Sequence, residues 1–225
     1  MLFNSYQFIF VFLPITLIVY FILNRRKLII AAKIWMILAS LFFYGYWNVR
    51  YIPILLFSII ANFFIGLRLN KYHSENKNRI SKKFILISGI IFNISLLGYF
   101  KYANFFIKNF DFAFNRKIEL LHVVLPLGIS FFTFTQITYL VDSYKGKARN
   151  YNLLNYLIFV TFFPHLIAGP ILHHKDIIPQ LSKIRNLVLN YRNIATGLFI
   201  FGIGLFKKVI FADTFAVWAN SGCVC

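Results

Sequence analysis

Apolar runs long enough to cross a membrane alternate with short polar stretches along most of this chain. The first run covers Tyr6–Leu23, and others follow at Leu28–Trp47, Tyr51–Leu67, Phe84–Phe100 and Leu121–Val141. About 20 apolar residues cross the hydrocarbon core of a bilayer as a helix, so we predict one transmembrane helix for each run. The pattern as a whole therefore predicts an all-α, polytopic transmembrane helix bundle.

Two later regions have the apolar composition of a span without its regularity. Residues 153–172 contain Pro164, Gly169 and Pro170, and a proline inside a helix removes a backbone donor and clashes with the preceding turn. Residues 194–219 carry two adjacent lysines at their centre, where each charge costs at least about 2.5 kcal/mol in lipid. We predict a broken or re-entrant segment at the first region. For the second we predict either two short pieces or a segment that lines a wet cavity.

The stretch 101–120 reads as a mixed connector between two spans. Within it, Tyr102–Phe106 has the composition of a helix that lies along the membrane interface. The basic residues of the chain, 24 Lys and Arg against 6 Asp and Glu, fall mostly between the apolar runs. This distribution is typical of a membrane protein with positively charged cytoplasmic loops, and it argues against nucleic-acid binding.

The same charges predict a topology. The N-terminus is placed outside, and the loops at 24–27, 68–83 and 142–152 are placed in the cytoplasm. If residues 153–172 form an ordinary span, the inner loops hold 12 Lys and Arg and the outer loops 9. If that segment enters and leaves on one side, the counts become 16 and 5. We therefore predict a re-entrant segment that opens to the cytoplasm, with a kinked ordinary span as the alternative.

The candidate site lies in and just after this segment and combines helix-breaking residues with polar ones. They are Pro164, His165, Gly169, Pro170, His173, His174, Lys175 and Asp176. Polar groups at membrane depth indicate a functional site by default. His165 either lines a cavity or bonds a carbonyl freed by a proline. No metal site is predicted, because His173, His174 and Asp176 lack a further ligand at a fixed spacing, and this loop suits lipid headgroups or donor phosphates better.

Short motifs in the order of a known family run through nearly the whole chain. They are Met1–Ser5, Phe12–Ile15, Gly98–Phe105, Leu125–Phe131, Val141–Gly146, Phe163–Pro170, Lys175–Asp176, Lys207–Val209 and Ala212–Thr214. Through these motifs the chain resembles the membrane-bound O-acyltransferase family, and in particular its alginate O-acetylation branch.

The resemblance implies an O-acetyltransferase of the bacterial inner membrane. It would move acetyl groups from a cytoplasmic donor, acetyl-CoA, to an extracytoplasmic polysaccharide, with periplasmic acetyltransferase proteins as partners and without a bound cofactor. Related branches acetylate peptidoglycan or transfer D-alanine. On this reading, residues 163–176 line the donor-side cavity. A transporter or flippase also uses broken helices, but the chain has no paired half-segments related by symmetry.

One part of the family pattern is not found in these 225 residues. The family's essential histidine follows a tryptophan, whereas none of Trp35, Trp47 and Trp218 precedes a histidine. We therefore expect residues 1–225 to be the N-terminal portion of a single transmembrane domain of this family. No catalytic residue is assigned in this chain, and we expect the chain to be inactive alone.

Overall fold

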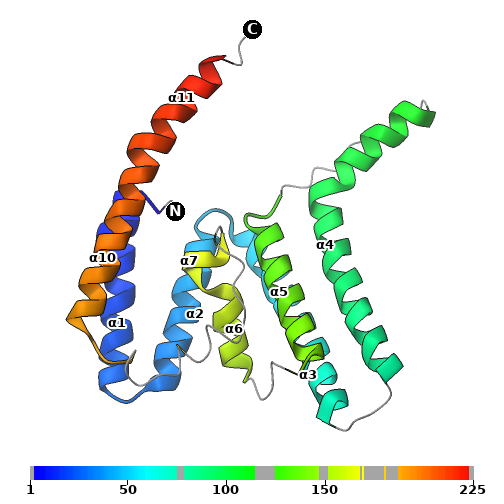
Figure 1. Cartoon of the computed structure of the whole chain (residues 1–225), viewed down its shortest axis with the longest axis horizontal. Coiled ribbons are helices and arrows are strands. Elements are labelled where there is room, and N and C mark those ends of the chain that lie inside the picture. Colours follow the sequence, from blue (N-terminus) through cyan, green and yellow to red (C-terminus); the bar gives the residue numbers. More distant parts are fainter. Residues whose placement is uncertain are drawn as a thin grey trace. The chain divides into compact units, whose positions relative to one another are not determined.

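The computed structural model describes residues 3–74, 79–114, 125–146, 152–167, 169, 180 and 187–222. Every regular element within these ranges is helical, and they contain no strand. The all-α class predicted from the sequence is confirmed. The α-helices, labelled as in Figure 1, are α1 (Leu13–Arg25), α2 (Ile29–Gly45), α3 (Ile52–Ser74), α4 (Arg79–Phe114), α5 (Ile129–Tyr144), α6 (Leu153–Thr161), α7 (Phe163–Leu166), α10 (Tyr191–Phe206) and α11 (Asp213–Gly222).

Short helical segments of other pitch adjoin three of these helices. A π-helical turn, η1 (Phe8–Phe12), leads into α1, and a 3-10 turn, η2 (Val49–Tyr51), leads into α3. A second π-helical segment, η3 (Lys207–Ala212), joins α10 to α11.

Several described helices are long and apolar enough to cross a bilayer. They cover Phe8–Arg25, Val49–Lys71, Ile80–Phe110 and Tyr191–Trp218, and Ile29–Gly45 forms a shorter apolar helix. The first four spans predicted from the sequence are confirmed as apolar helices. The chain is therefore a multi-pass membrane protein with an all-α helix bundle.

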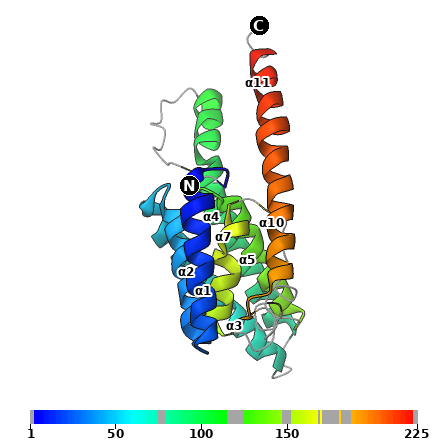
Figure 2. The ribbon, with the colours of Figure 1, turned by 90° about the vertical axis from the view of Figure 1, so that its left-hand side faces the viewer.

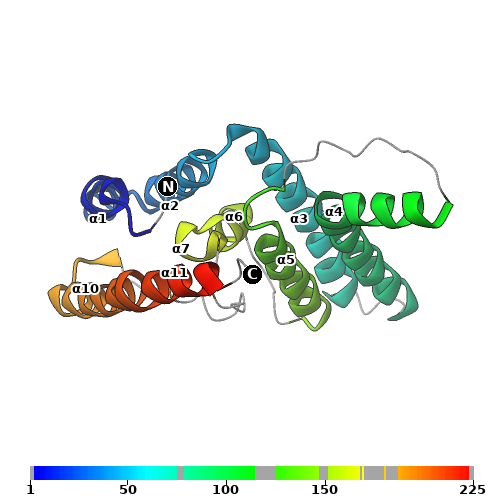
Figure 3. The same ribbon diagram turned by 90° about the horizontal axis from the view of Figure 1, so that it is seen from above.

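Helix α4 is longer than the sequence pattern predicted. The prediction of a connector from residue 101 is wrong up to Phe114, because α4 continues through this stretch. Residues 101–114 contain neither proline nor glycine, so their local chemistry does not end the helix. Figure 3 shows the final turns of α4 leaving at an angle to its first turns.

Helix α5 begins later than predicted. The predicted span started at Leu121, whereas the helix starts at Ile129 and residues 125–128 directly before it are not helical. Pro126 and Gly128 explain this start, because Gly128 has a φ of 70°, a left-handed conformation that costs glycine little. At the other end, the helix runs to Tyr144, slightly beyond the predicted boundary.

Two compact units divide the chain, and each is described by itself. One comprises residues 33–181, and the other comprises 1–32 together with 182–225. In the first unit, α3, α4 and α5 pack against one another, and α6 contacts both α3 and α5.

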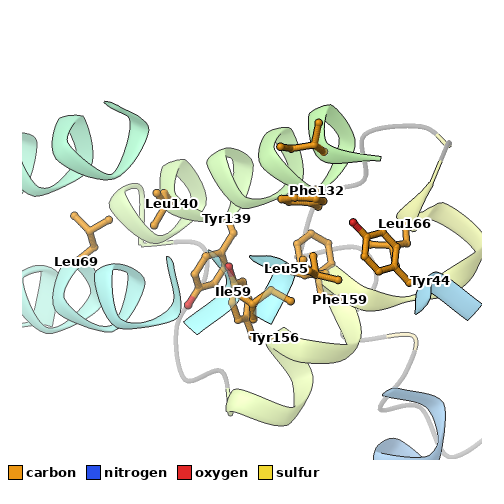
Figure 4. Close-up of a cluster of buried hydrophobic side chains, with 12 residues drawn as sticks. Tyr44, Leu55, Ile59, Leu69, Phe132, Tyr139, Leu140, Tyr156, Phe159 and Leu166 are labelled. Carbon is orange, nitrogen blue, oxygen red and sulfur yellow. The ribbon is translucent and has the colours of Figure 1, made fainter. Parts of the chain in front are cut away.

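Aromatic and aliphatic side chains together fill the core of the first unit (Figure 4). The rings of Tyr139 on α5 and Tyr156 on α6 lie with their centroids 4.2 Å apart, and Phe63 on α3 stacks on Tyr156 at 5.7 Å. Gly66 on α3 makes room for Tyr139, since a Cβ at this glycine would lie 2.6 Å from the tyrosine hydroxyl. The glycine therefore sets how closely α3 and α5 approach.

In the other unit, α10, η3 and α11 form one continuous helical run, Tyr191–Gly222 (Figures 1 and 2). The prediction of two short pieces is wrong. The lysine pair is accommodated by the wider π-helical turn, in which residues five apart face each other. Lys208 Nζ accordingly donates a hydrogen bond to Asp213 Oδ1. None of the residues in the apolar part of this run is buried.

Candidate functional site

The described part of the predicted re-entrant segment is a helix that breaks in its middle. Helix α6 ends at Thr161, and Phe162 leaves helical geometry with a ψ of 111° before α7 begins. Helix α6 has 9 residues and α7 has 4. At 1.5 Å per residue, α6 extends for about 14 Å, roughly half the hydrocarbon thickness of a bilayer. The break predicted from the prolines and the glycine is therefore present at Phe162.

A serine on α2 compensates for the break. The backbone N–H of Phe163, the first residue of α7, donates to Ser40 Oγ at 3.2 Å. Ser40 Oγ in turn donates to the carbonyl of Met36 on its own helix at 2.8 Å. Pro164 follows within the first turn of α7, where a missing backbone donor costs little. The N-terminus of α7 is thus capped from a helix more than a hundred residues earlier in the chain.

His165 bonds a carbonyl that the break releases. In a continuous helix, the N–H of Phe163 would donate to the carbonyl of Phe159. That carbonyl instead lies 2.8 Å from His165 Nε2. Because a carbonyl can only accept, Nε2 carries the hydrogen and the other ring nitrogen, Nδ1, is left for a different contact. The side chain is 8% exposed and lies beside the rings of Phe159 and Phe162.

The sequence left two roles open for His165, and the geometry favours the structural one for Nε2. The freed carbonyl belongs to Phe159, whose usual partner is displaced at the break, rather than to a residue four positions before a proline. This bond closes α7 back onto α6. The imidazole therefore holds the bent shape of the segment.

Helix α2 supports the broken segment along its length. Lys33 Nζ donates to Asn155 Oδ1 near the start of α6, at 2.7 Å. Further along both helices, the rings of Phe43 and Phe163 lie 5.7 Å apart. The order of these contacts means that α2 and α6 run in the same direction, as Figure 1 also shows. Lys33, which lies near the start of the second apolar run, thus has a defined partner.

Two glycines make the contacts around α7 possible. A Cβ at Gly128, before α5, would lie 2.7 Å from the carbonyl oxygen of Leu166, and the residue also has a positive φ. A Cβ at Gly169 would lie 3.1 Å from the Cβ of His165. The turn before α5 therefore approaches the backbone of α7, and Gly169 lies directly against His165.

The structure thus places Pro164, His165 and Gly169 together at the break. The other predicted members of the site lie outside the described residues; they are Pro170, His173, His174, Lys175 and Asp176. Within the described ranges, no three His, Cys, Asp or Glu side chains form a group that could hold a metal ion. The cavity around residues 163–176 stays a prediction.

A second polar feature, which the sequence analysis missed, joins α3, α4 and α5. We call Ser58, Asn62, Asn93 and Gln136 the amide cluster, and all four side chains are fully buried. Asn62 and Asn93 exchange hydrogen bonds, with Asn93 Nδ2 2.6 Å from Asn62 Oδ1. Gln136 Oε1 accepts from Ser58 Oγ and Asn62 Nδ2, each at 2.7 Å.

The amide cluster could have been found from the sequence. Asn62 and Asn93 have apolar neighbours, and Gln136 lies between threonines and apolar residues; all three are inside predicted spans. Polar residues in such places face a helical neighbour because lipid offers them no partner. Ser40 gives no comparable signal, since a lone serine in a span usually bonds its own helix, as Ser40 also does.

Comparison with known proteins identifies relatives of this chain. The family model for membrane-bound O-acyltransferases matches residues 41–219. A peptidoglycan O-acetyltransferase of Helicobacter pylori is 46% identical over 99% of this chain and 46% of its own length. Probable alginate O-acetylases AlgI of Pseudomonas aeruginosa and Pseudomonas syringae are 34% and 35% identical over 98% of this chain, and over 41% and 42% of their own lengths.

The chain spans less than half the length of these curated relatives. No solved structure matches it. The family model nevertheless covers most of the chain, including the amide cluster and the α6–α7 break. The chain belongs to the membrane-bound O-acyltransferase family.

Proposed function

We propose that this chain is part of an O-acetyltransferase that modifies a glycan outside the cytoplasmic membrane. The observation that carries the proposal is the similarity over 99% of the chain to a protein named peptidoglycan O-acetyltransferase. The acetyl donor is acetyl-CoA, bound from the cytoplasm as a substrate. Periplasmic acetyltransferase proteins act as partners in the final transfer.

Peptidoglycan is the better-supported acceptor, and alginate is the second candidate. Identity to the peptidoglycan O-acetyltransferase is 46%, against 34% and 35% for two probable alginate O-acetylases. The sequence resemblance pointed first to the alginate branch. The higher identity moves the preference to peptidoglycan.

The α6–α7 segment forms part of the donor side of this enzyme. A short helix that stops inside the membrane leaves a path for a polar donor without a complete pore. Helix α2 holds the break through Ser40 and Lys33, so the path keeps its shape when the donor binds. Pro164, His165 and Gly169 shape the described part of this path. Lys175 and the neighbouring histidines meet the phosphates of the donor.

We propose that the bundle lies in the bacterial inner membrane. Its N-terminus is outside, and residue 180 is in the cytoplasm. A Gln180→Cys variant tests it with a membrane-impermeant thiol reagent, after Cys223 and Cys225 are replaced by serine. We expect labelling only when the cytoplasmic face is accessible. Labelling from the outer face of intact cells contradicts the re-entrant arrangement.

The catalytic histidine of the complete enzyme is not assigned to these 225 residues. No tryptophan of the chain precedes a histidine, although the resemblance implies such a pair. We therefore propose that the chain alone does not transfer acetyl groups. A purified chain that releases CoA from acetyl-CoA at a rate above that of a heat-treated sample contradicts this proposal.

Acetyl content of the cell wall tests the function as a whole. We expect deletion of the coding locus to lower the base-labile acetate of purified peptidoglycan, and the intact locus supplied on a plasmid to restore it. A locus carrying Ser40→Ala should restore less than one carrying Ser88→Ala, whose hydroxyl bonds only its own helix. If peptidoglycan acetate is unchanged and another exported glycan loses acetate, that glycan is the acceptor instead of peptidoglycan. Unchanged acetate in every exported glycan overturns the function.

A further inference from the structure

The last turns of α4 extend beyond what a membrane span needs. The helix has 36 residues and is therefore about 54 Å long. The span predicted within it, Phe84 to Phe100, already accounts for about 26 Å, close to the hydrocarbon thickness of a bilayer. The remaining turns are therefore more than an upright helix needs to cross the hydrocarbon core.

The character of the helix changes at the same point. Before Gly98, apolar residues occur all around α4, whereas residues 99–110 divide into two faces. Tyr99, Tyr102, Phe106 and Phe110 follow one another at spacings of three or four, so they share one face.

The opposite face of these turns carries the polar residues, together with Phe105, which is 61% exposed. Lys101, Asn104 and Lys108 repeat with the same helical spacing, about half a turn away from the aromatic residues. Lys101 Nζ lies 5.4 Å from the ring centroid of Tyr102, so its charge sits at the edge of the aromatic face. We call residues Tyr99–Phe110 the aromatic arm.

The aromatic face of the arm is open. Tyr99, Tyr102, Phe106 and Phe110 are 52%, 44%, 66% and 46% exposed. Figure 3 shows that these last turns point away from the direction of the first turns. Gly98 sits between the two parts, and a Cβ there would meet nothing within 4 Å. Glycine is a common site of helix bending.

We propose that the aromatic arm lies in the membrane interface and that its occupant is the phospholipid surface itself. The aromatic face enters the boundary between headgroups and acyl chains, while Lys101 and Lys108 face the phosphates and water. Continuity favours lipid over a partner protein. The same helix exposes Ile91 and Ile94 to lipid directly before the arm, so the arm extends an existing lipid contact.

This arrangement fixes the depth of α4. Asn93 lies six residues before Tyr99, which places the amide cluster about 9 Å below the arm along the helix. An arm held at the interface thereby keeps the amide cluster within the hydrocarbon layer. The proposal does not depend on the enzyme activity, since it uses only the length, faces and exposure of α4.

Depth-dependent fluorescence quenching tests the proposal. The whole 225-residue chain, with Cys223 and Cys225 replaced by serine, is reconstituted into vesicles of phosphatidylethanolamine and phosphatidylglycerol. Single variants Phe106→Cys and Phe110→Cys report the aromatic face, Lys108→Cys the polar face and Ile91→Cys the span. Each carries a solvent-sensitive dye, and spin-labelled lipids quench it near the headgroup or near the chain end.

We expect the headgroup-proximal label to quench the dye at 106 and 110 about twofold more than the chain-end label, because interfacial helices sit only about 5–10 Å deep. At position 91, the chain-end label should quench the dye more than the headgroup-proximal label. Iodide in the water should quench the dye at 108 but not at 106. Equal access of iodide to 106 and 108 overturns the proposal, because the arm then projects into water. Protection of 106 from both lipid and iodide also overturns it, because a protein then covers the face.

Discussion

The α3–α4–α5 bundle and the helical run Tyr191–Gly222 solve one problem in opposite ways. Both are apolar enough to cross a membrane, and both carry polar side chains within the span. In the bundle, amides from three helices bond one another and are fully buried. In the run, Lys208 bonds Asp213 of the same helical run, and both side chains stay about half exposed.

The difference teaches what a polar residue in a span contributes. A hydrogen bond between two helices fixes which helices pack together and in which register. Any other packing would leave a buried donor or acceptor without a partner. A bond within one helical run only lowers the cost of carrying the charge. Stability of the bundle should therefore depend strongly on its polar residues, and stability of the run should not.

Asn62→Leu should have the largest effect. Asn62 donates to the buried Asn93 Oδ1, which loses this donor in the variant. Gln136 Oε1 loses one of its two donors, and Asn93 Nδ2 loses its bond to Asn62 Oδ1. We expect the free energy of unfolding to fall by about 2–3 kcal/mol, measured by denaturant unfolding in mixed micelles. The double variant Asn62→Leu with Asn93→Leu should recover part of this loss, because both members of the reciprocal pair are then apolar. If Asn62→Leu is as stable as the parent, the bundle does not depend on its polar residues more than the helical run does, and the comparison fails.

Gly66→Ala should come next. The added Cβ would lie 2.6 Å from the Tyr139 hydroxyl, so either this fully buried ring or the two helices must shift. A loss of about 1–3 kcal/mol is expected in the same unfolding assay. The matched change in the other region is Gly204→Ala, where a Cβ meets nothing within 4 Å. That variant should gain about 0.5–1 kcal/mol from helix propensity, and a loss there would reveal a close neighbour.

Ser40→Ala should cost about 1 kcal/mol. It leaves the first N–H of α7 without its acceptor, although the rest of the α2 contact remains. Limited proteolysis and the unfolding assay both report the change. Ser88→Ala is the control, because that exposed hydroxyl bonds only the carbonyl of Ile85 on its own helix, and its removal should change neither readout.

Asp213→Asn should have the smallest effect, below about 1 kcal/mol, because the ion pair with Lys208 is half exposed. A double-mutant cycle with Lys208→Gln isolates the pair from the loss of each charge. A coupling energy as large as that of the Asn62–Asn93 pair would mean that the run is packed as tightly as the bundle, and the comparison would fail.

Much of the architecture follows from hydrophobic periodicity, but the breaks and joints do not. The spans around Tyr6–Leu23 and Tyr51–Leu67 were predictable because lipid imposes both length and apolarity. The break near Pro164 was predictable because proline cannot continue a helix. The continuity of α4 through residues 101–114 was missed, because a polar face at the membrane surface resembles a loop in composition.

The candidate site divides in the same manner. His165 stood out because a histidine in an apolar run needs a partner, yet the choice of the Phe159 carbonyl depends on where the helix breaks. Ser40 could not be assigned, because its bond to Phe163 joins positions 123 residues apart. Periodicity records which face of a helix is buried, and it carries no information on which distant backbone group lies against that face.

The distance along the chain between Ser40 and Phe163 also has a consequence in time. A ribosome adds about 5–20 residues per second, so α2 waits roughly 6–25 s in the membrane before α7 is made. During this interval, the Ser40 hydroxyl donates its hydrogen bond to the carbonyl of Met36 in the same helix, so it needs no partner from later segments. When α6 arrives beside α2, the same hydroxyl is free to accept. Helix α2 is therefore complete before α6 and α7 are synthesised, and the broken segment packs against it afterwards.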